Sequence, residues 1–123
     1  MKALAMLAFI AAFAANAADV KVSWTHPTQY SDGTVLALEN IKDTRVQYGS
    51  CTTATTPTFG TLAVEKYVLA PAALHTFTTV AAGTYCFRAQ TTDLQGRISP
   101  WSVVVSKPIV EIKPKAPTSV VIG

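Results

Sequence analysis

Few residues of this chain could do chemistry: it has two cysteines, two histidines and seven carboxylates in 123 residues. The carboxylates are scattered, without the spacing of an acid/base pair. The chain contains no Gly-x-Ser-x-Gly, His-Glu-x-x-His or Gly-rich phosphate loop. Two cysteines without matching histidines do not make a zinc site. We therefore expect no enzyme activity, no cofactor, no metal and no catalytic role for His26 or His75.

Residues 1–17 have the pattern of a secretory signal peptide. Lys2 gives a positive start, residues 3–15 are all apolar, and Ala15-Asn16-Ala17 fits a cleavage site. The apolar run is short for a membrane span, and an uncleaved anchor is the alternative. We expect a mature chain from Ala18, secreted or periplasmic and without a membrane attachment. Loss of Lys2 lowers the formal net charge from +3 to +2, with no basic cluster, so no nucleic-acid binding is expected.

The elements that would position these residues are strands. Residues 19–25 alternate, with Val20, Val22 and Trp24 on one face, and residues 44–48 alternate again with Val46 and Tyr48 inward. Turn signals of Gly, Pro, Asn and Asp separate them from further short segments of strand composition. These segments are 62–69, 74–80, 85–91 and, as the last core strand, 101–105. The pattern predicts an all-β antiparallel sandwich over residues 18–110.

Five short motifs follow one another in an order that resembles the bacterial and phage fibronectin type III domain. They are Val22-Ser23-Trp24-Thr25-His26-Pro27, Asp32-Gly33-Thr34, Arg45-Val46-Gln47-Tyr48-Gly49, Gly83-Thr84-Tyr85 and Asp93-Leu94-Gln95-Gly96. The resemblance covers residues 20–107. It implies that Trp24 plugs the core and that Tyr85 forms a tyrosine corner. Because the family serves many functions, the resemblance implies a module and not an activity.

In that fold the two cysteines are expected to form a disulfide. If Val46 and Tyr48 point inward, Cys51 falls on the outward face, and so does Cys86 beside an inward Tyr85. The fibronectin type III fold makes these strands antiparallel neighbours, which brings the cysteines within reach of each other. An oxidising compartment favours the bond, which would add roughly 3–4 kcal/mol of stability. A pair of free thiols is the alternative.

The C-terminal residues 111–123, a Pro-containing linker and tail, depart from the family pattern. The family opens with a Pro-containing apolar strand that this chain lacks before Trp24. Here Ala116-Pro117-Thr118, followed by Val120 and Ile122, resembles that strand displaced to the other end. The missing strand starts at the opposite pole, roughly 30 Å away, so a return to the same domain is marginal. The alternatives are a disordered tail, a tail covering its own sheet edge, and a strand donated to a second copy.

We expect the loops at one pole of the sandwich to bind a partner, because the long connection 26–43 and the turn 93–97 fall at the same end. The candidate residues are Tyr30, Asp32, Asp93, Leu94 and Arg97. A second candidate is the flat outward face of Arg45, Gln47, Arg88 and Gln90. The function expected is a secreted module that binds protein or glycan. The alternatives are an assembly subunit of a surface filament or phage particle, joined by its C-terminal strand, and an accessory enzyme or inhibitor, for which no motif is present.

Overall fold

The computed structural model describes residues 17–52, 55–110 and 113–123. The predicted signal peptide lies outside this part of the chain except for Ala17, which begins the first strand. Within the described residues, the elements are six strands and a short 3₁₀-helix. They are β1 (Ala17–Ser23), η1 (Leu38–Asn40), β2 (Ile41–Cys51), β3 (Phe59–Leu69), β4 (Leu74–Ala81), β5 (Gly83–Asp93) and β6 (Val105–Ile109). No helix among these residues is long and apolar enough to span a membrane.

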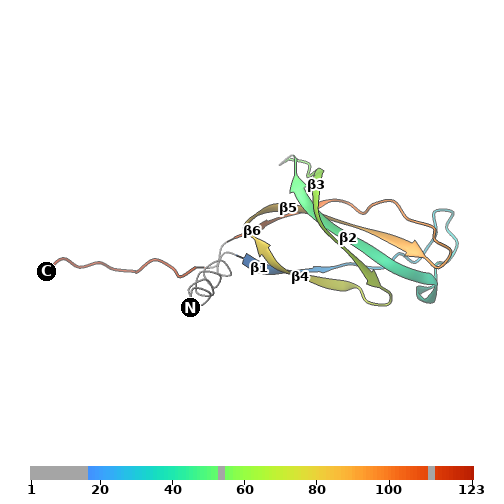
Figure 1. The fold of residues 1–123 in the computed structure, drawn as a ribbon, viewed down its shortest axis with the longest axis horizontal. Helices are drawn as coiled ribbons and strands as arrows, with labels where there is room; N and C mark the ends of the chain where they lie inside the picture. The colour runs from blue at the N-terminus through green and yellow to red at the C-terminus, as the bar shows by residue number, and fades with distance from the viewer. Residues whose placement is uncertain (1–16, 53–54, 111–112) are drawn as a thin grey trace, which may run out of the picture.

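The strands form two antiparallel sheets, as the alternating patterns predict. One sheet has the order β1-β4, and the other has the order β3-β2-β5-β6. Figure 1 shows the two sheets as layers, with the long strands β2 and β5 running almost the whole length of the domain. The prediction of an all-β fold is confirmed.

The hydrophobic core lies between the two sheets. Tyr48 of β2 is central to it, because its ring packs edge-on against Phe77 of β4 at 4.9 Å and lies 5.5 Å from the ring of Phe87 of β5. Val20 and Val46 are buried there, as their alternation predicts. Apolar burial of this kind is the main stabilising contribution to folding. The core therefore joins both sheets into one body.

Trp24, just after β1, is only partly buried and packs at the side of this core. Its backbone N–H donates to the carbonyl of Ala73. The expectation that Trp24 plugs the core is therefore met only in part, since the centre is occupied by Tyr48 and Phe77.

The last strand is not where its apolar run predicts. The sequence predicts a core strand over residues 101–105, but β6 covers Val105–Ile109 and Val103 is 85% exposed. The preceding segment follows β5 through serine side chains, because Ser99 Oγ and Ser102 Oγ accept the N–H groups of Thr91 and Ala89 at 3.0 and 2.9 Å. These hydroxyls replace ladder carbonyls, which keeps the segment irregular until Val105.

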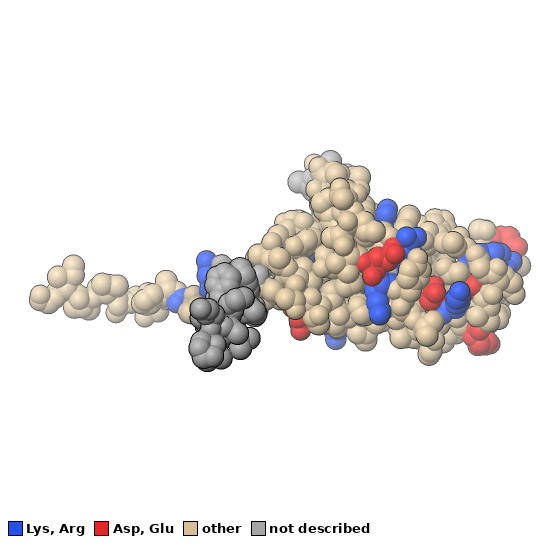
Figure 2. Space-filling view, in the orientation of Figure 1, with Lys and Arg blue, Asp and Glu red and all other residues tan. Residues whose placement is uncertain are grey.

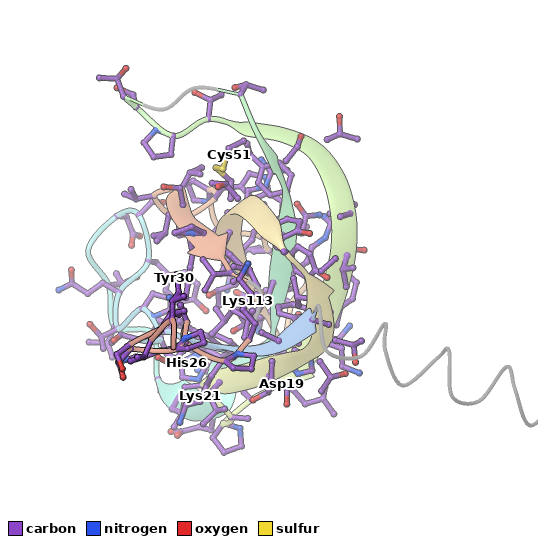
Figure 3. The ribbon with its side chains drawn as sticks, turned by 90° about the vertical axis from the view of Figure 1, so that its left-hand side faces the viewer. Asp19, Lys21, His26, Tyr30, Cys51 and Lys113 are labelled. Atoms are coloured by element: carbon purple, nitrogen blue, oxygen red, sulfur yellow. A yellow bond between two sulfur atoms is a disulfide. The ribbon has the colours of Figure 1, made fainter. Side chains whose placement is uncertain are left out.

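The predicted disulfide between Cys51 and Cys86 is present, with 5.2 Å between the Cα atoms. It lies on the outer face of the four-stranded sheet, as the parity of the two residues predicts. Viewed along the molecule, Cys51 is on the opposite side from Asp19 and Lys21 of β1 (Figure 3). Cys86 is nevertheless fully buried, and its sulfur lies 3.8 Å from the carbonyl oxygen of Thr58, just before β3. The bond therefore ties the end of β2 to β5.

The tail, residues 113–123, forms no strand with β1 and runs away from the domain (Figure 1). Val120 and Ile122 are 84% and 95% exposed. In this structure the tail therefore does not cover the edge of its own sheet.

Candidate functional site

Two loops meet at the pole where β5 ends, and a glycine shapes each of them. The first loop is closed by the bridge between Gln29 and Val35, and its turn uses Gly33 at φ 88°. The second turn follows β5 and uses Gly96 at φ 85°. Residues with side chains rarely adopt such positive φ values. At the tip of the first loop, Asp32 Oδ1 accepts the backbone N–H and the hydroxyl of Thr34 at 3.0 and 2.7 Å.

Asp93 connects the two loops, although it is only 3% exposed. Its Oδ1 accepts the N–H groups of Gln95 and Arg97 at 3.0 and 2.8 Å. Its Oδ2 accepts Arg97 Nε at 2.7 Å and the Tyr30 hydroxyl at 3.0 Å. Burial opposes ionisation, but the hydrogen bonds from Arg97 and Tyr30 outweigh it and hold the pKa of Asp93 below its ordinary value. All four donors bind the ionised carboxylate, which makes Asp93 a structural anchor and not a free base.

Arg97 completes what we call the pole cluster, Tyr30, Asp93 and Arg97. Its guanidinium carbon lies 4.7 Å from the centroid of the Tyr30 ring, and its Nη2 donates to the Tyr30 hydroxyl at 3.2 Å. Burial, together with the hydrogen bond to Asp93, raises the pKa of Tyr30. The Arg97 side chain remains 63% exposed. Three of the five predicted pole residues thus lie in one contact cluster, fixed in position before any partner binds.

The pole cluster borders a hollow of about 750 Å³, lined by both loops and by residues that follow the turn. Ile98 lines the hollow and is 62% exposed. Leu94, the fourth predicted residue, is 59% exposed on the adjoining turn, and its N–H donates to the carbonyl of Asn40. Asp32, the fifth, lines the hollow from the loop tip. The pole therefore combines exposed apolar groups with a fixed cation.

The second predicted surface, on the outside of the four-stranded sheet, is saturated by contacts of its own. Arg45 Nε and Gln47 Nε2 both donate to Glu65 Oε1 at 2.6 Å, and these hydrogen bonds, first that of Gln47, lower the pKa of Glu65. Arg88 donates to Gln47 Oε1 at 2.9 Å. Gln90 donates to the carbonyl of Ser99. Polar groups that satisfy one another in this way have little left for a ligand.

Aromatic rings complete this saturated face, and sequence reasoning missed them. The Arg88 guanidinium carbon lies 4.0 Å from the ring centroids of Phe59 and Trp101, and that of Arg45 lies 5.4 Å from the Trp101 ring. Trp101, predicted in a core strand, therefore lies on the outside of the sheet. The strand register could have shown part of this arrangement, because Arg45 pairs directly with Tyr67, whose ring it also approaches.

In the part of the chain that the structure describes, the remaining titratable residues do not assemble into a further centre. His75 packs edge-on against Phe77 at 4.7 Å, and His26 Nε2 lies 3.2 Å from the Pro71 carbonyl oxygen. Over the described ranges, no group of three His, Cys, Asp or Glu side chains is arranged to hold a metal ion. On the face shown in Figure 2, positive and negative side chains are interspersed.

Comparisons of the chain with protein-family models, with curated proteins and with solved structures gave no match.

Proposed function

We propose that this chain is a non-catalytic, extracytoplasmic binding module of fibronectin type III architecture, which recognises its partner with the loop pole. The strand order, β1-β4 against β3-β2-β5-β6, resembles that of a fibronectin type III domain without its first strand. The Tyr85 hydroxyl donates to the carbonyl of Ala81, four residues upstream, at 2.9 Å. This hydrogen bond is the signature of a tyrosine corner.

The disulfide supports the extracytoplasmic part of the proposal. Disulfides persist in oxidising compartments and are rare in the cytosol. The bond between Cys51 and Cys86, together with the signal-peptide pattern of residues 1–17, fits a secreted or periplasmic protein.

The main support for a binding function is the pole cluster. Tyr30 and Arg97 belong to the residue types that dominate interfaces, and Asp93 fixes both before binding, which lowers the entropy lost on association. The exposed cation of Arg97 lies in the same turn region as the exposed apolar side chains of Leu94 and Ile98. A protein segment with acidic and apolar residues is therefore favoured over a glycan.

Selection of random phage-displayed peptides on immobilised chain 18–123, beside a glycan array, tests this function. We expect enriched peptides whose affinity falls about tenfold or more in Arg97→Gln and Ile98→Ser. Leu62→Ser, at a 45% exposed position of β3, is the matched control and should bind normally. Glycan binding that depends on Arg97 would replace the protein partner by a glycan. Binding that is equal in all variants would show that the pole is not the site.

A second candidate function is an assembly subunit, and a different observation favours it. Among the strands that the structure describes, β1 pairs only with β4, and the apolar tail lies off its own domain.

A further inference from the structure

The free edge of β1 borders an apolar groove. Among the described strands, β4 alone pairs with β1. The groove, of about 450 Å³, is lined by the consecutive residues Val20 to Trp24 on one side. Since inward and outward residues of β1 both line it, the groove runs along the edge of the strand and not over one face. Val103 and Val105, from the segment beside β5, form part of its other wall.

This groove has the dimensions and the chemistry of a site for one added strand. Val20 to Trp24 are five residues, which extend over roughly 17 Å at the rise of a strand. An unpaired edge offers a row of backbone donors and acceptors, and an added strand can use them. Val22, Trp24 and Phe87 give the groove an apolar floor for side chains that alternate inward.

The tail of the chain carries a segment that matches this site. Residues 118–122 are also five residues long, and Val120 and Ile122 share one side of an extended chain. Val120, Val121 and Ile122 are between 84% and 95% exposed. Such a run of apolar side chains in water is typical of a segment that becomes buried in a partner.

The spacer before this segment directs it away from its own domain. Proline fixes φ at Pro114 and Pro117, and it confines the preceding Lys113 and Ala116 to extended conformations. A tight reversal beside β6 is therefore disfavoured. An antiparallel return would instead have to begin beside Ser23, at the pole opposite the end of β6. The structure accordingly has the tail projecting outward (Figure 1).

We infer that the groove between β1 and residues 102–107 binds residues 118–122 of a second copy of this chain. The added strand pairs with the free edge of β1, and Val120 and Ile122 fill the groove. Because donor and acceptor surfaces differ, the contact is head-to-tail and continues from copy to copy. The inference deepens the second candidate function and does not depend on the loop pole.

Complementary variants of the chain 18–123 test this contact by mass measurement in solution. Val120→Asp/Ile122→Asp destroys the donor, and Val103→Arg blocks the acceptor; all three positions are at least 84% exposed, so both variants should fold. We expect the wild-type mass to increase with concentration and each variant to stay monomeric. A 1:1 mixture of the two variants should form dimers and stop there, since one donor and one groove remain intact.

Two control variants define the contact. Val35→Arg, 78% exposed at the loop pole, should assemble like the wild type. Val121→Asp points to the other side of the added strand and should assemble far better than Ile122→Asp. A wild-type chain that stays monomeric at every concentration, or assembly that survives Val120→Asp/Ile122→Asp, would overturn the inference. Neither result would bear on the loop pole, which Ile98→Ser tests separately.

Discussion

At the scale of single residues, Asp93 is the group on which the pole depends, and its ionisation should be visible in stability. Its pKa is lowered in the folded state, so it stabilises the fold above its ordinary pKa of about 4 and loses this contribution as pH falls further. We expect the urea concentration at the unfolding midpoint to decrease as the pH is lowered from about 5 to about 3. The decrease should be smaller in Asp93→Asn, which has no carboxylate to protonate at this position.

The matched control for Asp93→Asn is Glu39→Gln, which removes an exposed negative charge from η1 at the same pole. Its midpoint should follow the wild-type pH profile. An Asp93→Asn profile parallel to that of the wild type would show that the hydrogen bonds to Asp93 do not hold its ionised form.

Also at the residue scale, the sequence indicated which side chains meet at the pole but not how. Tyr30, Asp93 and Arg97 could be placed together because a sandwich brings alternate loops to one end. Three of the four hydrogen bonds to Asp93 come from its own turn. The fourth comes from Tyr30, 63 residues away in the chain, and the same turn is joined through the Leu94 N–H to the distant carbonyl of Asn40. Such contacts leave no local pattern in a sequence.

At the scale of elements, the disulfide joins two strands that already pair, so its effect should appear chiefly in the unfolded chain. Cys51 and Cys86 are 35 residues apart, and closing a loop of that size contributes roughly 3–4 kcal/mol. We expect reduction of the wild type to lower the free energy of unfolding by about this amount. The reductant should leave Cys51→Ala/Cys86→Ala unchanged, and an equal response of both proteins would contradict the assignment.

Strands were predictable where the sequence alternates with burial, as in β1, where Val20 is buried between the exposed Asp19 and Lys21. The final strand was not predictable in this way, because residues 101–105 are apolar apart from Ser102 and yet lie largely at the surface: Val103 and Val105 are 85% and 60% exposed. Apolar side chains beside an unfilled groove give the same pattern as a core strand. The last strand was therefore misplaced because Val103 and Val105 line the groove that we propose for the second copy.

At the scale of the whole molecule, the loop pole and the groove share no lining residue, so binding and assembly can act separately. Assembly can therefore be measured independently of partner binding, through its effect on stability. A donated strand binds the folded state and not the unfolded chain, and so it stabilises by mass action. We expect the Tm of the wild-type chain 18–123 to rise with protein concentration.

The comparison that decides this last prediction is calorimetry at two concentrations a hundredfold apart. Val120→Asp/Ile122→Asp should melt at one temperature throughout, whereas Val35→Arg should follow the wild type. At a hundredfold excess over its dissociation constant, a bound strand adds about 2.7 kcal/mol. A shift of several degrees would follow for a domain of this size. If the wild-type Tm is independent of concentration, the tail does not bind the edge of β1 in a second copy, and the proposed assembly is wrong.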